Sequence, residues 1–333
     1  MRVGVLLTGA SQEIAAADAY EQWIEHAQVA EENGFDSAWV VESHFSTGVP
    51  CPSPITVGAA IAAATRDIRV GVSIKLPLDH PLKICEDAAV LDLLSGGRLL
   101  FGADPELSAE EWNGSCFAWT DRWELFCETL DIIVKGWTQD GFAYLGKFYR
   151  LPLETRVVGS GNPFQPEPCD PPYLMPMERA GLPFDYLSVL PKPVQIPHPP
   201  IYLAGASQRS VEFAARNGNS LLLAQGGDPT QTAAVYWKAL EQAGRQRHEV
   251  DLVIARDVYV EADGYKTRSC IDNVSDDAFV GSPREVLHEI KALQRKTGMR
   301  HFLCHMQLQG LSPDRVNDSL RRFASEVRPL LQM

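Results

Sequence analysis

The sequence lacks three features, and each absence disfavours a class of protein. It has no apolar run that approaches the length of a membrane span, so we do not expect a membrane protein. It has no run of lysine or arginine, and its net charge of −13 argues against a surface for nucleic acid or anionic lipid. Any site for a phosphate group must therefore be local.

The cysteines do not form a recognisable disulfide or metal-binding pattern. There are seven, an odd number, none of them is part of a C-x-x-C pair, and no secretory leader is recognisable. We therefore expect reduced thiols and a cytoplasmic protein. Cys51 lies between two prolines in a loop and could be reactive, but free cysteines are usually buried, so packing is its expected role.

What the chain does contain is a regular alternation of short apolar runs and helical patterns. The predicted strands are 3–8, 35–41, 68–76, 98–103, 201–204, 220–224, 252–260 and 301–305. The predicted helices are 18–33, 55–65, 81–94, 121–137, 208–217, 229–246, 283–297 and 313–331. A small hairpin is predicted within 142–149. Eight such units, with no sequence repeat and no break in composition, predict one (β/α)₈ TIM-barrel domain over 1–333 rather than an open doubly wound sheet.

One stretch, 151–190, interrupts this alternation. It is rich in proline and glycine and has no helical or strand period. Long irregular insertions in compact domains are usually functional lids or mobile segments. We interpret it as a lid over the barrel mouth or, equally, as a dimerisation or disordered arm on the surface.

In a TIM barrel the active groups lie at the C-terminal ends of the strands. This rule selects several residues for attention: Glu42, His44, Lys75, Asp104, Gly205 and Gln225. The segment that ends the fifth strand is the most distinctive of these. It runs through Ala204, Gly205 and Ala206 to Ser207, which begins a helical pattern. Such a corner offers backbone N–H groups and a helix N-terminus to an anion, although Gly205 and Ser207 could also be only turn and capping residues.

Four segments together resemble the luciferase-like monooxygenase family, whose members are flavin- or deazaflavin-dependent barrels. They are 30–45, with Ala-Glu-Glu-Asn-Gly-Phe-Asp and Glu-Ser-His-Phe; 76–99, with Leu-Pro-Leu-Asp-His-Pro and Ser-Gly-Gly-Arg; 191–205; and 280–286. They cover nearly the whole chain in the expected order. Only the region from 150 to 190 lies outside the resemblance.

The resemblance implies a function and a set of partners. Reduced FMN would sit at the barrel mouth, react with oxygen and oxygenate a small organic substrate, with the flavin reduced by a separate flavin reductase. A deazaflavin is the less favoured cofactor, and a homodimer or a heterodimer with a homologue is expected. Ser73 and Lys75 would lie near the flavin ring, and Ala204, Gly205, Ala206, Ser207 and Arg209 near its phosphate.

Two departures from the family pattern concern the chemistry. Members commonly have Glu-His-His-Phe after the second strand, whereas here Ser43 replaces the first histidine. Acid–base work would then fall to His44, with Glu42 beside it, or His44 could only pack and form hydrogen bonds. After the fourth strand the family usually has an arginine for the flavin phosphate. This chain has Asp104-Pro105-Glu106 instead, whose carboxylates would repel a phosphate dianion or merely cap the loop.

These departures keep two alternatives open. The first is a flavin-free homologue that serves as the non-catalytic partner subunit of a heteromeric complex. The second is a barrel with a changed cofactor or mechanism, in which the carboxylates of Glu42, Asp104 and Glu106 act with His44. No metal site is expected, because strand alternation places Cys304 on the opposite face from His301 and His305.

Overall fold

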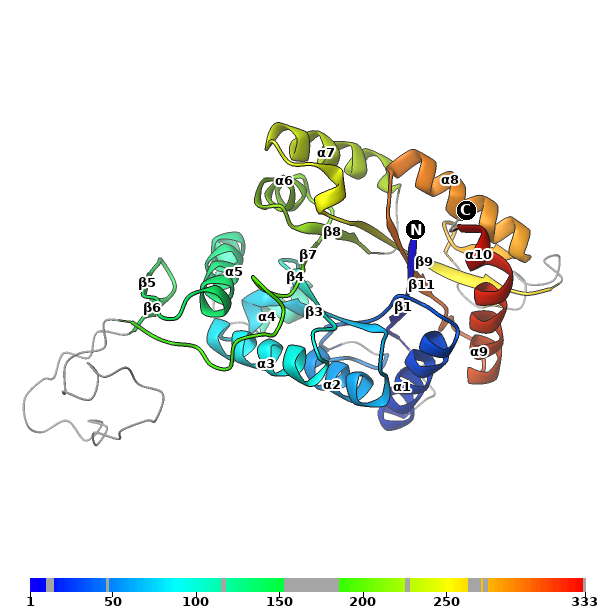
Figure 1. Ribbon diagram of the computed structural model, residues 1–333, viewed down its shortest axis with the longest axis horizontal. Coiled ribbons are helices and arrows are strands. Elements are labelled where there is room, and N and C mark those ends of the chain that lie inside the picture. Colours follow the sequence, from blue (N-terminus) through cyan, green and yellow to red (C-terminus); the bar gives the residue numbers. More distant parts are fainter. Residues whose placement is uncertain are drawn as a thin grey trace, which may run out of the picture.

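Eight parallel strands close into a barrel around a central axis (Figure 1). The computed structural model describes residues 1–9, 15–45, 48–114, 118–152, 186–224, 228–262, 271 and 275–331. The barrel strands are β1 (Arg2–Leu7), β2 (Ser37–Val41), β3 (Arg69–Lys75), β4 (Leu99–Asp104), β7 (Ile201–Ala204), β8 (Ser220–Leu223), β9 (Leu252–Val260) and β11 (His301–His305). They pair in this order, β8 pairs with β9, and β11 returns to β1. The predicted TIM barrel and its eight strands are confirmed.

Helices surround the barrel because each strand is followed by a segment with an apolar face. They are α1 (Ala16–Glu32), α2 (Pro54–Ala64), α3 (Pro81–Leu94), α5 (Arg122–Thr138), α6 (Gln208–Asn217), α7 (Pro229–Gln242), α8 (Pro283–Thr297) and α9 (Pro313–Arg322). A π-helical turn (Phe323–Val327) joins α9 to α10 (Arg328–Leu331). No helix in the described ranges is both long and apolar enough to cross a bilayer.

One layer of apolar side chains fills the middle of the barrel lumen. It consists of Leu6, Trp39, Leu100, Tyr202, Leu222, Val253, Ala255 and Leu303. Gly71 is required here, since a side-chain carbon at this position would lie 2.0 Å from the Trp39 ring. Closer to the C-terminal ends of the strands, the lumen-facing positions include Ser73, Gly102 and Ala204, which are small. The upper part of the lumen therefore has room for polar chemistry.

Much of the family-like sequence builds the opposite, N-terminal face of the barrel. Arg98 donates to the carbonyl oxygens of Ala62 (2.7 Å) and Ile68 (2.9 Å). The fully buried Asp92 accepts from the backbone amides of Val194 (2.8 Å) and Gln195 (3.0 Å). Arg98 thus joins the start of β4 to α2 and to the residue before β3, and Asp92 joins α3 to the segment before β7, so both residues stabilise the fold away from the mouth.

The structure contains short elements that the sequence patterns did not predict, and it ends one helix earlier. The short helix α4 (Ala109–Asn113) lies in the loop after β4, a 3₁₀ turn (Trp119–Asp121) precedes α5, and β10 (Phe279–Gly281) pairs with β9. Helix α7 ends at Gln242 rather than 246, because Gly244 has a positive φ of 72°.

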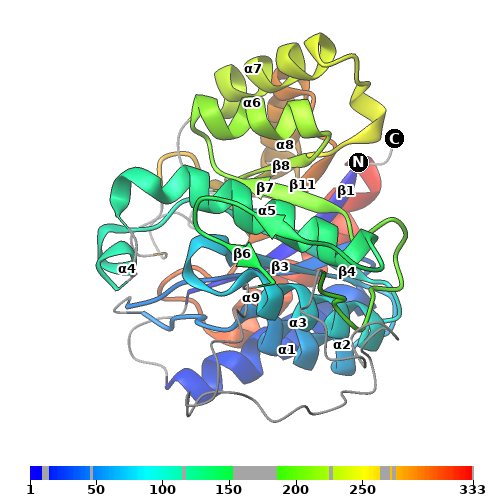
Figure 2. The same ribbon diagram turned by 90° about the vertical axis from the view of Figure 1, so that its left-hand side faces the viewer.

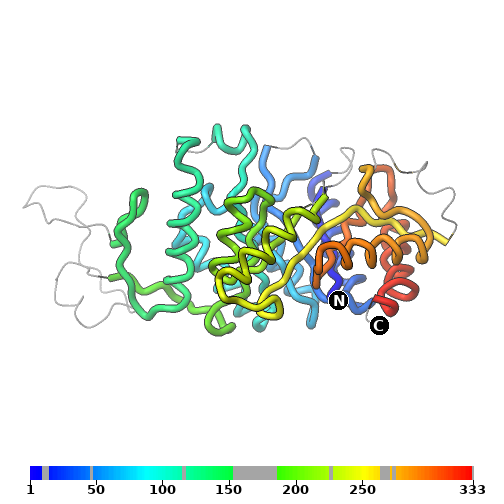
Figure 3. The backbone as a smooth tube through the Cα atoms, turned by 90° about the horizontal axis from the view of Figure 1, so that it is seen from above, coloured from blue at the N-terminus to red at the C-terminus, as the bar shows by residue number. Residues whose placement is uncertain are grey.

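The predicted hairpin is present as β5 (Tyr144–Leu145) and β6 (Arg150–Leu151), which pair antiparallel. In two further views it lies on the outer side of α5, at one end of the molecule (Figures 2 and 3). Most of the predicted insertion, 153–185, lies outside the described residues. Its proposed roles as a lid or as an arm are therefore predictions still.

Candidate active site at the mouth of the barrel

A buried carboxylate and an imidazole lie at the end of β2. The Oε1 atom of Glu42 is 2.6 Å from Nε2 of His44, and its Oε2 atom accepts the Lys75 amide at 2.8 Å. Burial raises the pKa of the Glu42 carboxyl, although the bonds from His44 and Lys75 oppose this shift. Among the described residues, Nδ1 of His44 has no hydrogen-bond partner. His44 therefore has one nitrogen fixed by Glu42 and the other available to a ligand.

Ser43 has a structural role next to this pair. Its backbone amide donates to the Cys51 carbonyl, and its hydroxyl accepts the Cys51 amide, both at 3.0 Å. The Cys51 thiol is buried, and burial followed by the nearby Glu42 charge raises its pKa to about 12. The thiol is thus protonated at neutral pH, which agrees with the expected packing role.

Lys75, at the end of β3, binds the loop that follows β4. Its ammonium nitrogen lies 2.9 Å from the Glu106 carbonyl, 3.1 Å from Glu111 Oε2 and 3.7 Å from Asp104 Oδ2. A lysine at this position could also have paired with Glu42, but among the described residues only the Lys75 backbone amide contacts Glu42. The side chain instead neutralises carboxylates of the β4–α4 segment.

Glu111 is a residue of this site that sequence reasoning missed. It is 4% exposed and belongs to α4, where Ser108 and Glu111 form a reciprocal capping box. Burial raises the pKa of its carboxyl, but bonds from the Ser108 amide and the attraction of Lys75 outweigh burial and lower it overall. Its other oxygen accepts the His44 amide at 3.2 Å, so Glu111 links His44 to Lys75. The Ser-x-x-Glu spacing at 108–111 was the signal that could have identified it.

Asp104 is the most strongly perturbed carboxyl at the mouth. Burial raises its pKa to about 6, against the opposing effects of Lys75 and of the Glu106 amide, which donates to Oδ1 at 2.8 Å. Carboxyl groups that titrate near neutrality are frequent in active sites. Asp104 can therefore exchange a proton in the physiological range.

Ser73 supplies an unused polar group to the lumen. It is 1% exposed, and its hydroxyl has no hydrogen-bond partner among the described residues. A side-chain carbon at Gly102 would lie 3.0 Å from this hydroxyl, so only glycine leaves the space beside it open. A buried hydroxyl without a partner is costly unless a ligand or water satisfies it. Ser73 thus fits a role in ligand binding.

The corner after β7 has the form predicted for an anion site. Gly205 has a φ of 115°, and Ser207 caps α6 by accepting the Ser210 amide. In the described part of the chain, the amides of Ala206, Gln208 and Arg209 have no acceptor, as is usual in the first turn of a helix. These groups, next to the end of β7 at Ala204, could hold an anion.

The Arg209 side chain is directed elsewhere. It binds Glu124 of α5 at 3.2 Å and lies over the Trp123 ring with its guanidinium carbon 4.9 Å from the ring centre. The group at the corner is instead a carboxylate. A side-chain carbon at Gly205 would lie 2.9 Å from Oε1 of Glu106. The Glu106 segment thus brings Asp104, Lys75 and Gly205 together, whereas the Arg209 guanidinium contacts Glu124 and Trp123 instead.

The profile of the luciferase-like monooxygenases matches residues 1–269, most of the chain. The chain belongs to this family. The sequence resemblance is therefore confirmed.

Individual relatives are distant. The oxygenase component of flavin-dependent trigonelline monooxygenase from Acinetobacter baylyi is 26% identical over 60% of this chain and 47% of its own length. The chain spans less than two thirds of the first curated relatives that it matches. Among solved structures, monooxygenase RslO1 from Streptomyces bottropensis has a TM-score of 0.84 at 24% identity, covering 99% of this chain and 100% of that one. The oxygenating constituent of 3,6-diketocamphane monooxygenase from Pseudomonas putida, in complex with FMN, has a TM-score of 0.78 at 19% identity, covering 99% and 98%.

The inner part of this site, near Ser73, and its outer part, near Gly205, differ in how well they could accommodate a flavin. The inner half suits an isoalloxazine ring, because it offers the unpartnered Ser73 hydroxyl, the open space at Gly102 and the free nitrogen of His44. The outer half has the N–H groups for a phosphate, but the Glu106 carboxylate already lies against Gly205. The ring thus fits these residues and the phosphate does not.

A second histidine lies across the mouth. His305 at the end of β11 has Nδ1 2.7 Å from Asp257 Oδ1 and Nε2 2.9 Å from the Thr8 carbonyl. Both ring nitrogens are hydrogen-bonded within the protein, so His305 has a structural role in the barrel wall. As alternation predicted, Cys304 packs in the outer core, away from His305. Within the described ranges, no group of three or more potential ligands could hold a metal ion. Gln225 lies outside them.

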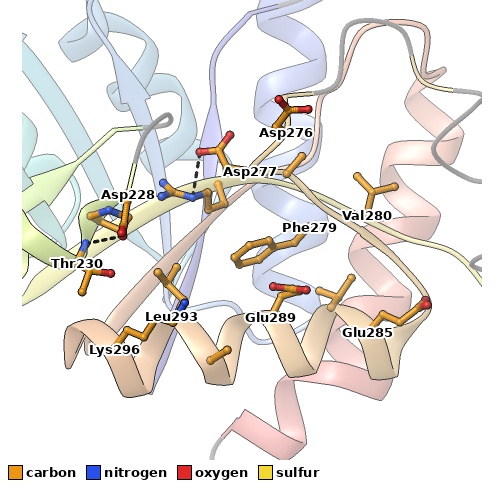
Figure 4. Close-up of a pocket in the computed structure, with 15 residues that line it drawn as sticks. Asp228, Thr230, Asp276, Asp277, Phe279, Val280, Glu285, Glu289, Leu293 and Lys296 are labelled. Carbon is orange, nitrogen blue, oxygen red and sulfur yellow. Dashed lines mark hydrogen bonds and ion pairs between the residues drawn. The ribbon is translucent and has the colours of Figure 1, made fainter.

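A polar cavity of about 510 Å³ lies outside the barrel, between the start of α7, β9, β10 and α8 (Figure 4). Its walls carry Asp228, Asp276, Asp277, Glu285, Glu289 and Lys296. The buried Arg256 pairs with Asp277 at 3.4 Å on its inner side. None of the described residues predicted for the active site lines this cavity. It is a separate feature of the outer surface.

Proposed function

We propose that this chain is the oxygenase of a two-component system, which uses a reduced flavin and O₂ to oxygenate a small organic substrate. The observation that carries the proposal is the fixed Glu42–His44 pair at the mouth of a luciferase-like barrel that also contains the unpartnered Ser73 hydroxyl. The names of the relatives support it, since one is an oxygenase component and another was solved with FMN. A separate flavin reductase would supply the reduced flavin.

The residues present define what the protein itself contributes. A reduced flavin, when bound, supplies the reaction with oxygen. Ser73 would donate or accept a hydrogen bond at the ring edge, from a site with no competing partner. His44 would hold or release a proton at Nδ1, while Glu42 fixes its Nε2 nitrogen and orients the ring. Asp104, with a pKa of about 6, is a second proton-exchanging group at the rim.

Anaerobic titration with flavin tests this proposal directly. Oxidised and reduced flavin are added separately to the purified chain, and binding is followed by flavin fluorescence and absorbance. We expect the reduced form to bind at about micromolar concentration or below, which corresponds to roughly −8 kcal/mol. Absence of binding by either form would remove the proposal. It would instead favour the flavin-free alternatives, namely a non-catalytic partner subunit or a barrel with a changed mechanism.

We propose a class of substrate from the aromatic residues of the segment after β4. The buried Trp112 packs edge-on against Trp119 at 5.5 Å, and we propose that such apolar side chains line the mouth. A small apolar or aromatic compound suits such surroundings.

We also propose that the chain forms a homodimer, in which α3 packs against a second copy of the chain. This helix exposes three apolar side chains on one face: Val90 (42%), Leu93 (45%) and Leu94 (70%). Spacings of three and four place them side by side. The neighbouring surface of α2 is built from alanines, which permit close approach of another helix. A homodimer through α3 would remove this face from water.

A further inference from the structure

The carboxylate of Glu106 stands where a flavin phosphate would be expected. Its Oε1 atom is 2.9 Å, and its carboxyl carbon 3.3 Å, from the position of a side-chain carbon at Gly205. Ser210 Oγ lies 3.3 Å from the same position. Glu106 is therefore at the N-terminus of α6, next to the free amides of Ala206, Gln208 and Arg209. The helix N-terminus, which favours a negative charge, already has one from the protein itself.

The charges around the corner also disfavour a second anion. Asp104 and Glu111 lie on the same segment as Glu106, and Lys75 is bonded to Glu111 and to the Glu106 carbonyl. The Arg209 guanidinium of α6 is directed toward α5, where it pairs with Glu124. In the described structure, the corner thus has no cation that is not already engaged by a carboxylate. A phosphate dianion would have to displace Glu106 and remain close to it and to Asp104.

A neutral hydroxyl meets no such obstacle. It can donate a hydrogen bond to the Glu106 carboxylate and accept one from an amide of the α6 N-terminus. The unpartnered Ser73 hydroxyl lies farther inside the lumen, where it would face the flavin ring and not the end of the ribityl chain, so this choice does not affect it. The corner is therefore better matched to a sugar-alcohol chain than to its phosphate ester.

We propose that Glu106 is a specificity-determining residue, which makes the site select a flavin that ends in a hydroxyl, riboflavin, over FMN. This inference rests on the proposed function, since it requires that a flavin binds at the mouth. Glu106 would contact the ribityl end of a bound flavin and would have no part in the oxygen chemistry. Its removal should change which flavin binds without changing where the ring lies.

The test compares riboflavin and FMN in the wild-type chain, Glu106→Gln and Glu110→Gln. Glu110 is exposed on α4, so its variant makes the same change in net charge without touching the corner. Dissociation constants are measured anaerobically for the oxidised and reduced forms by fluorescence quenching. We expect wild type and Glu110→Gln to favour riboflavin, and Glu106→Gln to shift the riboflavin-to-FMN affinity ratio toward FMN by about tenfold or more. Far-UV circular dichroism and a thermal melt verify that each variant is folded.

The outcomes separate the inference from the proposed function. If flavins bind but the ratio is the same, within about threefold, in wild type and Glu106→Gln, Glu106 does not select the ligand and the inference is overturned. If neither flavin binds to any folded variant, the proposed function itself fails. If FMN binds only after Glu106 is replaced, the exclusion of phosphate by Glu106 is supported.

Discussion

The Nε2 atom of His44 lies 2.6 Å from Oε1 of Glu42, and this contact leaves Nδ1 as the imidazole nitrogen that can face a ligand. Glu42 is itself held by the Lys75 amide, so the imidazole is oriented by a group that cannot easily move. The pair is therefore suited to hold or transfer a proton at the mouth of the barrel.

Replacing His44 by Asn should slow reoxidation of the bound reduced flavin by about a hundredfold, if His44 is the acid–base group. Glu42→Gln should reduce the rate by about tenfold, since the imidazole keeps its place but loses its charged partner. Stopped-flow absorbance after mixing with oxygen, repeated across the pH range, measures both effects. His248→Asn, at an exposed position on the outer surface, is the matched control. A normal rate and pH profile in His44→Asn would show that His44 only packs.

Replacing Lys75 by Met should destabilise the chain by about 3 kcal/mol, because it leaves the buried Glu111 without its cation. Lys83→Met is the comparison, since Lys83 pairs with Asp87 on the exposed face of α3 and its loss should change stability by about 0.5 kcal/mol or less. Urea unfolding followed by circular dichroism gives both values. Equal effects of the two substitutions would mean that Lys75 does not hold the β4–α4 segment.

The strands could be predicted because each is a short apolar run between turn residues, and this pattern depends only on local sequence. The Glu42–His44 contact could also be predicted from the sequence, because two residues that follow the end of the same strand must lie close together. The role of the residues that carry the family resemblance was harder to predict. Arg98 and Asp92 bind carbonyl and amide groups at the N-terminal face, so their presence indicates the fold more than the chemistry.

The contacts between residues that are far apart in the sequence could not be predicted in this way. Glu106 meets Gly205 because β4 and β7 are neighbours in the barrel, and Lys75 meets Glu111 because α4 folds back over β3. Arg209 had two possible directions at the start of α6. The Trp123 ring and Glu124 on α5 determine its direction, and neither is visible from the sequence around Arg209.

The proposed homodimer predicts that Leu94→Arg yields a monomer. Leu94 is 70% exposed at the end of α3, and a guanidinium there would be buried without a partner in a dimer formed through this face. Size-exclusion chromatography with light scattering measures the mass directly. Leu330→Arg, at a 42% exposed leucine on α10, should leave the mass unchanged. A wild-type chain that is monomeric at all concentrations would exclude the interface.

The pKa of Asp104 predicts how stability changes with pH. In the folded chain burial raises this pKa from the ordinary value of 3.8 to about 6, so the unfolded chain loses the proton first as the pH rises. Folding is therefore penalised progressively between about pH 4 and pH 6, and fully above that range. Asp104→Asn keeps an oxygen for the Glu106 amide and has no charge to bury. It should be more stable than wild type by about 1 to 2 kcal/mol at pH 8, after allowance for the lost attraction to Lys75.

This difference should disappear as the pH is lowered to about 4, where Asp104 is protonated in the folded chain and increasingly so in the unfolded one. Urea unfolding of both proteins at several pH values provides the measurement. Asp140→Asn, at an exposed carboxylate after α5, makes the same change in charge and should show no such trend. An Asp104→Asn variant that is less stable than wild type at pH 8 would mean that the ionised carboxylate stabilises the mouth through Lys75. The ion pair, and not burial, would then dominate at this position.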